Sequence, residues 1–248
     1  MLSGFDVKTM TEPVCVAELI KMYQELMNEE KLDGMSSSEL EKDHWEFFAK
    51  RILEEAFPDR FMGLELGESP DLRNGVLGVG IGVTSAEDFE MKKRDSLYFR
   101  KYLCGKEEER KNARGYIEKT GGIITEHGLS HPVFFRELSG IYNAISVKTK
   151  KLNTNYDKLR YNGLFVFNIM IILDAELSTV LEEIIKIEKK KEYRVAFDEI
   201  FIYCYGGDII DFDVRNRKIK RIHLSTKLVN EISKESICAV KKDDNNEK

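Results

Sequence analysis

The sequence contains few cysteines and no long apolar segment, and both features limit what the chain can be. The longest apolar run, Leu164–Leu173, has ten residues, about half of what a membrane-spanning helix needs. The N-terminal segment lacks the pattern of a signal peptide. We therefore expect a protein of the reducing cytoplasm without a membrane partner, whose cysteines act as small buried hydrophobic residues. The four cysteines are too far apart for a disulfide scaffold or a CxxC pair: Cys15, Cys104, Cys204 and Cys238.

Internal repeats and linkers rich in proline, glycine and serine are also absent, which predicts a single domain. We place this domain at residues 1–240, with a helical extension at 1–35 and a core at 60–205. Residues 241–248 are strongly polar and are expected to form a disordered tail. Hydrophobic residues make up 42% of the chain and charged residues 33%, which is ordinary for a protein with a buried core.

Acidic and basic residues are distributed unevenly, although the net charge is only −5. Residues 1–91 contain 8 Lys and Arg against 20 Asp and Glu, whereas residues 92–248 contain 31 against 24. Two basic clusters stand out, at 92–114 with nine cations and at 215–227 with six. Such clusters attract polyanions, nucleic acid among them. The alternative is a solvated helical face and an exposed hairpin.

The spacing of apolar residues and turn residues predicts a mixed α/β fold. The polar stretch 105–122 is expected to be a mobile loop. Helices are expected at about 11–34, 36–57, 86–103, 131–152, 177–190 and 225–240. Strands are expected at 61–66, 76–83, 163–173 and 194–205, followed by further strands around turns at 206–207 and 215–218.

The segment ESPDLRNGVLGVGIGVTSAED, residues 68–88, reads as part of a β-hairpin with the turn pair Asn74-Gly75. When the loop of a hairpin has an even number of residues, cross-strand partners have an odd index sum and share a face. Asp71, Gly82 and Thr84 are therefore predicted to point the same way. An acidic residue on one strand facing an acid-x-lysine triplet on the next is a pattern that holds magnesium against a phosphodiester.

Residues 68–87 resemble the active-site hairpin of the PD-(D/E)XK nuclease superfamily, in bacterial branches whose second half reads approximately G-I-E-V-T. Residues 144–167, AISVKTKKLNTNYDKLRYNGLFVF, are similar to the following helix and buried strand of that family, and residues 197–203 to a later strand. The resemblance implies a restriction endonuclease-like core, a central mixed sheet flanked by helices, here with an extra N-terminal helix. It also implies a Mg²⁺ or Mn²⁺ cofactor and hydrolysis of nucleic acid, in the first place DNA.

The match to the family motif is incomplete. Pro70-Asp71 agrees with its first half, but Gly82 stands where the second metal-binding carboxylate is expected, and Thr84 stands where many members have lysine. Loss of a carboxylate removes both charge and an oxygen ligand, so magnesium should bind more weakly and cleavage should be slow or absent.

Other residues could complete such a site. The metal ligands that the resemblance suggests are Asp71, Glu46 from the preceding helix and Glu68, with Glu65 further away along the strand. Lys148, on the later helix, could supply the missing cation, so that Asp71, Thr84 and Lys148 form the expected catalytic set. Glu46 and Lys148 could equally be solvated helix charges.

The second hypothesis is a nuclease fold that has lost catalysis and binds nucleic acid or a protein partner. Gly82 favours this hypothesis, and a homodimer is left open. A dinucleotide site at Gly78-x-Gly80-x-Gly82 has little support, because the spacing departs from GxGxxG and no βαβ unit opens the chain. His127 and His131 lack a third ligand for zinc.

Overall fold

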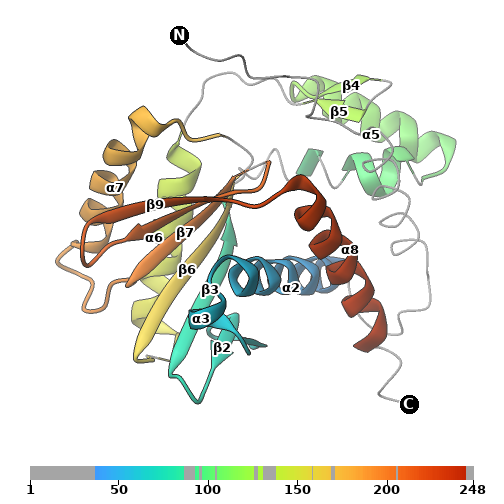
Figure 1. Ribbon diagram of the computed structural model, residues 1–248. Helices are drawn as coiled ribbons and strands as arrows, with labels where there is room; N and C mark the ends of the chain where they lie inside the picture. The colour runs from blue at the N-terminus through green and yellow to red at the C-terminus, as the bar shows by residue number, and fades with distance from the viewer. Residues whose placement is uncertain are drawn as a thin grey trace, which may run out of the picture.

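The computed structural model describes residues 37–86, 93–94, 97–103, 105–125, 128–130, 138–157, 159–168, 171–204 and 206–243. The predicted helix at 11–34 lies outside these residues, as do Cys15, Cys104, His127 and His131. In the described part the chain forms a mixed α/β fold with a seven-stranded sheet, a two-stranded sheet and seven helices (Figure 1). None of the described helices is both long enough and apolar enough to cross a membrane.

The large sheet is parallel in its centre and antiparallel at both sides. Its central strands β3, β6 and β7 run parallel, and each of the two connections between them carries a helix, as parallel pairing requires. The outer strands pair antiparallel with their neighbours. In spatial order the strands are β1 (Glu65–Leu66), β2 (Leu72–Asn74), β3 (Val79–Ser85), β6 (Tyr161–Asn168), β7 (Glu199–Cys204), β8 (Asp208–Asp213) and β9 (Lys218–His223).

Helices cover both faces of this sheet (Figure 1). Leu164 and Val166 of β6 belong to the core beneath α6 (Ser139–Thr154) and α7 (Asp174–Glu188). Phe165, between them, belongs to the core on the opposite face, beneath α2 (Ser37–Ala56), α3 (Pro58–Phe61) and α8 (Thr226–Asp243). Because β6 is buried on both faces, its residues 163–167 are continuously apolar, which confirms the prediction of a buried central strand, although the strand ends at Asn168 and not at residue 173.

Two of the sequence predictions around the hairpin need correction. The strand expected at 61–66 comprises only Glu65–Leu66, because Phe61 ends α3 and packs its ring edge-on against Phe201. The hairpin loop spans residues 75–78 instead of Asn74-Gly75, since Asn74 pairs with Val79. This loop is also even in length, so the predicted parity of cross-strand partners is unchanged.

A small unit is inserted between β3 and α6. It contains the π-helix η2 (Tyr98–Leu103), α5 (Glu107–Lys119), β4 (Ile123–Thr125) and β5 (Gly128–Ser130). The prediction of a mobile loop at 105–122 is therefore wrong. Ala113 and Ile117, one helical turn apart, are buried, and the Glu109 carboxylate accepts a hydrogen bond from the Lys106 backbone N–H at the start of α5.

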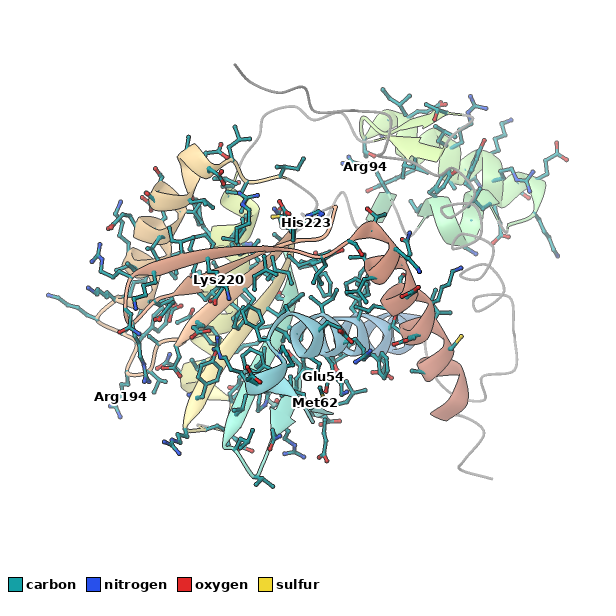
Figure 2. All side chains as sticks on the ribbon, in the orientation of Figure 1. Glu54, Met62, Arg94, Arg194, Lys220 and His223 are labelled. Carbon is teal, nitrogen blue, oxygen red and sulfur yellow. The ribbon has the colours of Figure 1, made fainter. Side chains whose placement is uncertain are left out.

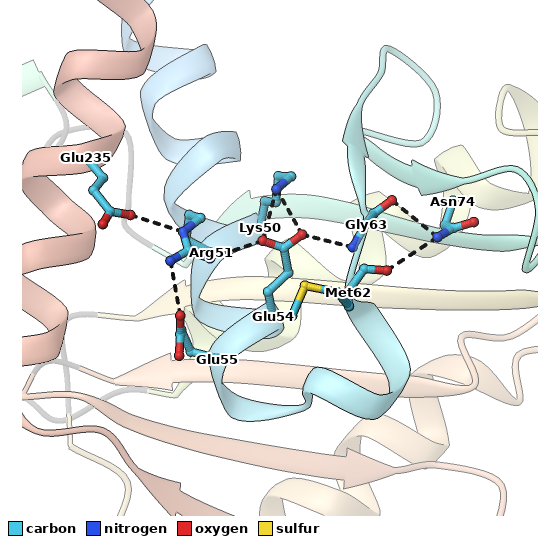
Figure 3. Close-up of polar contacts among 8 residues, drawn as sticks. All are labelled: Lys50, Arg51, Glu54, Glu55, Met62, Gly63, Asn74 and Glu235. Carbon is cyan, nitrogen blue, oxygen red and sulfur yellow. Dashed lines mark hydrogen bonds and ion pairs between the residues drawn. The ribbon is translucent and has the colours of Figure 1, made fainter.

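The C-terminal helix α8 extends to Asp243, beyond the expected start of the tail at residue 241, and residues 244–248 lie outside the described part. This helix packs beside α2, and Arg51 of α2 forms an ion pair with Glu235 of α8 (Figure 3). Buried Glu54 accepts hydrogen bonds from Lys50 and from the Gly63 backbone N–H, which fixes the chain entering β1. Its neighbours thus satisfy a carboxylate that would be costly to bury alone.

His44 lies at the buried contact between α2 and α8, where its Nδ1 is 3.0 Å from the Ser236 hydroxyl. Burial lowers the pKa of His44 from 6.5 to about 4, because the charged imidazolium would lose its hydration. The unfolded chain therefore binds more protons than the folded one between these values. The stability that neutral His44 contributes is present above pH 6.5 and is lost as the pH falls towards 4.

We predict that replacing His44 by Gln makes the fold less sensitive to acid. Between pH 7 and pH 4 the free energy of unfolding of the wild-type protein should fall by about 3 kcal/mol more than that of His44→Gln. The reason is that the pKa of His44 is about 4 in the folded protein and 6.5 in the unfolded chain. Urea unfolding at several pH values measures this difference. His223→Gln, at an exposed histidine of β9, is the control, and an equal pH dependence of wild type and His44→Gln would contradict the prediction.

Candidate functional site

The hairpin directs Asp71 towards β3, as the sequence predicted. Leu72 pairs with Ile81, so the preceding residue, Asp71, lies across from Gly82. The Oδ2 atom of Asp71 accepts a hydrogen bond from the Val83 backbone N–H at 2.6 Å. With 6% of its surface exposed, Asp71 is a buried carboxylate and needs partners of opposite charge or good hydrogen-bond donors.

Lys148 provides that partner. Its Nζ lies 2.7 Å from Oδ2 of Asp71, and it also donates to the Tyr156 hydroxyl at 2.9 Å. Lys148 is only 8% exposed, since it lies on the face of α6 that also buries Ile145 and Leu152. The apolar stripe of the helix thus carries the ammonium group to Asp71. The predicted meeting of Lys148 and Asp71 is confirmed, although the sequence suggested a phosphate as the target of the lysine.

Glu46 approaches the same cluster from α2. It is 4% exposed, and burial raises its pKa to about 7, with a further contribution from the negative charge of Asp71. Lys42, one turn earlier on α2, opposes this shift through an ion pair of 3.4 Å. Near neutral pH Glu46 is therefore only partly ionised. Glu46 is buried and its charge interacts with that of Asp71, so it is not a solvated helix charge, whereas its role as a metal ligand stays a prediction.

Gly82 and Gly80 leave space that other side chains occupy. A Cβ at residue 82 would lie 3.3 Å from Cε2 and 3.4 Å from the hydroxyl of Tyr156. A Cβ at residue 80 would lie 2.6 Å from Pro70 Cγ. Glycine on β3 thus allows Pro70 and the ring of Tyr156 to approach the strand closely. The place of the expected second carboxylate is taken by Tyr156.

Tyr156 remains a neutral phenol. Burial raises its pKa, and the negative charge of Asp71 raises it further. The hydroxyl, which accepts a hydrogen bond from Lys148, lies 3.5 Å from Asp71 Oδ2 as a donor. The side chains of Asp71, Lys148 and Tyr156 are therefore joined to one another by hydrogen bonds.

The other predicted site residues do not join this network. Glu68 is exposed in the turn before Pro70, and Glu65 is exposed on β1, so neither replaces the missing carboxylate. Thr84 is half-buried on β3, where it pairs with Val166 of β6. The structure therefore brings together Asp71, Glu46 and Lys148 but leaves Glu68 outside.

These residues do not fit a resident Mg²⁺ or Mn²⁺ ion. In the described part of the chain no three His, Cys, Asp or Glu side chains are placed to hold a metal. Asp71 Oδ2 already binds an ammonium group and a backbone N–H, and Gly82 offers no side-chain oxygen. Glu46 is partly protonated near pH 7. Magnesium prefers anionic oxygen ligands, and an ammonium group bonded to one of these oxygens competes with the ion for it.

Sequence reasoning missed Tyr156 and Lys42 as members of the cluster. Lys42 could have been found, because its spacing of four residues from Glu46 is that of a helical ion pair. Tyr156 gave no such signal. It follows the end of α6, and only the folding of this segment over β3 brings its ring to Gly82.

A second group of charged residues forms a basic surface away from the Asp71 cluster, and we call this surface the basic end. It is formed by the segment between α7 and β7 and by the turn between β8 and β9, which line one cavity together. The sequence indicated only the second segment, although KIEKKKEYR, residues 186–194, has five cations. The basic end consists of Lys189, Lys190, Lys191, Arg194, Arg215, Arg217 and Lys218.

The basic residues of the inserted unit are arranged differently. On α5, Arg114 forms an ion pair with Glu118, and Glu109 forms one with Lys101 of η2. Three glutamates, residues 107–109, also open α5. Two cations of the inserted unit are thus paired, but its described residues within 93–125 still hold nine Lys and Arg against four Glu, so this unit is basic as well.

No family model matches this chain, and comparisons with curated proteins and with solved structures also found no match. The resemblance to the PD-(D/E)XK superfamily rests on the motif residues of the sequence and stays a prediction.

We predict that Lys148→Met destabilises the fold by about 3–5 kcal/mol, because it leaves the buried carboxylate of Asp71 without its cation. The loss of unfolding free energy in the double variant Asp71→Asn/Lys148→Met should be about 1–3 kcal/mol smaller than the sum of the losses in the two single variants. Urea unfolding at pH 7 measures all three. Lys150→Met, on the exposed side of α6, is the matched control. A loss for Lys148→Met no larger than that of the control would contradict a buried ion pair.

A second prediction concerns Glu46. Its pKa is raised in the folded protein, so the stability associated with its protonated form is present at pH 4.5 and below and is lost as the pH rises through 7. Glu46→Gln removes this dependence. As the pH rises from 5 to 8, the free energy of unfolding of the variant should increase by about 1–3 kcal/mol relative to that of the wild type. Thermal or urea unfolding across this range is the measurement. A difference between variant and wild type that does not change with pH would contradict it.

Proposed function

We propose that this chain is a domain of restriction endonuclease-like fold that binds nucleic acid, in the first place DNA, without cleaving it. The observation that carries the proposal is the ion pair of 2.7 Å between Lys148 and Asp71 at the place where the resemblance expects a metal ion. Buried Cys204, with a free thiol, fits the reducing cytoplasm in which we place the domain.

The order of elements supports the fold assignment. A helix, α2, precedes three antiparallel strands, and α6 then leads to β6, which pairs parallel to β3. The acidic residue lies at the start of the middle strand of this set, next to the central strand. This is the arrangement that the resemblance implies for an active-site hairpin and its crossover helix.

The Asp71 cluster supports the absence of cleavage. Metal-assisted hydrolysis needs a cation that polarises the phosphate and activates water. To admit that cation, Lys148 would have to leave Asp71 and Glu46 would have to ionise fully, and both groups are buried. The existing ion pair and the neutral phenol of Tyr156 already satisfy Asp71. The cluster is therefore more stable as a structural network than as a metal site.

The basic end supports nucleic-acid binding. Its cations belong to two adjacent loops and are exposed, so a phosphate backbone can reach them without rearrangement of the sheet. Arg194 lies at the outer edge of the molecule in Figure 2. Binding of this kind is driven by the release of counterions from the polyanion and weakens as salt increases.

A metal-dependent nuclease is the second candidate. The observation that favours it is that Asp71, Glu46 and Lys148 approach one another from a hairpin and two helices, because these are residue types that the resemblance expects at such a site. Cleavage assays separate the two candidates.

We predict that the wild-type protein does not cleave labelled single- or double-stranded DNA, or RNA, with Mg²⁺ or Mn²⁺ above the level of Asp71→Asn. Gly82→Glu/Tyr156→Ala should gain metal-dependent cleavage, because the second substitution makes room for the restored carboxylate. Gly82→Gln/Tyr156→Ala is the uncharged control. Wild-type cleavage that Asp71→Asn abolishes would establish the second candidate instead. No gain in the Glu variant would count against the family assignment.

We predict that the protein binds DNA and that Lys190→Glu/Lys191→Glu/Lys218→Glu weakens binding about tenfold or more, by loss of phosphate contacts. Fluorescence anisotropy with a labelled oligonucleotide at two salt concentrations measures this. Arg110→Glu/Lys111→Glu/Lys119→Glu on α5 has the same change in charge and should bind within about threefold of wild type. Absence of DNA binding by the wild type would refute the proposal, and a larger loss in the α5 variant would place the interface elsewhere.

A further inference from the structure

A cavity lies within the basic end, and neither the Asp71 cluster nor the proposed binding of a phosphate backbone accounts for its shape. Its volume is about 410 Å³, within the range of small-molecule sites in proteins. It lies where the end of α7, the segment before β7 and the β8–β9 turn meet. The residues that line it are Ile185, Glu188, Lys189, Arg194, Val195, Ala196, Phe197, Val214, Arg215 and Arg217.

Four cations surround this cavity. Arg215 forms an ion pair with buried Asp198, and Arg217 forms one with exposed Glu182. Lys189 and Arg194 are exposed, and neither forms an ion pair with another residue in the described ranges. Their charges are therefore available to an anion, and the planar fork of arginine suits the oxygens of a phosphate.

The floor of the cavity is apolar. Val195 and Val214 are partly buried and present the apolar surface of this floor, above Ile185 and Phe197, which are buried. Such a floor cannot bind a phosphate by itself, but it can cover the body of a ligand whose phosphate reaches the cations. The lining therefore indicates a ligand with one strongly anionic end and one flat or apolar part.

Glu188, the acidic residue of the lining, is turned towards the protein. Its Oε1 accepts a hydrogen bond from the Thr149 hydroxyl at 2.5 Å, and its Oε2 accepts one from the Phe197 backbone N–H at 2.8 Å. Burial raises the pKa of Glu188 to about 7, which reduces its negative charge at and below neutral pH. It therefore opposes an anion in the cavity only weakly.

The backbone beside the cavity is anchored to α6. Asn153 Oδ1 accepts hydrogen bonds from the backbone N–H groups of Arg194 and Val195, at 2.8 and 3.0 Å. Asn153 Nδ2 donates to the Val195 carbonyl at 2.8 Å. This anchoring places Arg194 before any ligand arrives, so less ordering entropy is lost on binding.

We propose that this cavity binds the terminal phosphate and adjoining base of a nucleotide. The phosphate lies against Lys189, Arg194 and Arg215, and the base covers the apolar floor at Val195 and Val214. A free mononucleotide and the 5′-phosphorylated end of a strand present the same chemistry to the cavity. The proposal goes beyond backbone binding, since it requires a terminal phosphate and no extended strand.

Isothermal titration of the full-length protein with AMP, adenosine and inorganic phosphate tests the proposal. AMP should bind about tenfold more tightly than either of its parts, because only AMP uses both the cations and the floor. Lys189→Ala/Arg194→Ala should weaken AMP binding about tenfold or more, by loss of charge-assisted hydrogen bonds. Lys150→Ala/Arg110→Ala, with the same loss of charge on exposed helix faces, should leave it unchanged.

Oligonucleotides with a 5′-phosphate or a 5′-hydroxyl distinguish the two sources of the nucleotide. Tighter binding of the phosphorylated strand, lost in Lys189→Ala/Arg194→Ala, supports a strand end, whereas binding of AMP without that preference supports a free nucleotide. If AMP does not bind and the 5′-phosphate has no effect, the proposal is refuted. Binding of the 5′-hydroxyl strand reports on the proposed function separately, so the failure of one is distinguishable from the failure of the other.

Discussion

The arrangement of the candidate site depends on the buried ion pair between Lys148 and Asp71. A carboxylate with so little exposed surface persists only beside a cation or several donors, and Lys148 with the Val83 backbone N–H supplies both. The pair joins α6 to the β2–β3 hairpin and so fixes the crossover helix against the central sheet. Tyr156 can then lie over Gly82, where a larger residue would meet its ring.

The same helix organises the cavity at the basic end. Thr149, next to Lys148 in the chain, binds Glu188 on the floor of the cavity, and Asn153, one turn later, holds the backbone of Arg194 and Val195. Successive positions of α6 therefore contact the Asp71 cluster on one side and the residues around the cavity of the basic end on the other. A shift of α6 would alter both, which makes this helix the physical link between them.

The Asp71 cluster and the basic end differ in the sign and the burial of their charged residues. The Asp71 cluster buries its acidic groups, with Glu46 kept partly neutral by burial, whereas the cations of the basic end remain exposed. Exposed cations meet phosphate at a small cost in desolvation, while buried carboxylates already paired with lysine gain little from a metal ion. This division of charge is the physical basis of the proposed binding without cleavage.

The sequence by itself determined the face that Asp71 shares with Gly82, because the two-residue period of strands depends only on local geometry. It also determined the buried β6, through the apolar residues 163–167, whereas Glu46 and Lys148 were candidate site residues only through a family resemblance. Only the tertiary structure decided that Lys148 binds Asp71 and that Tyr156 fills the space at Gly82. It also made residues 107–119 a helix and joined residues 189–194 to the β8–β9 turn. These outcomes depend on contacts between residues far apart in the chain, whose distances and burial no local pattern encodes.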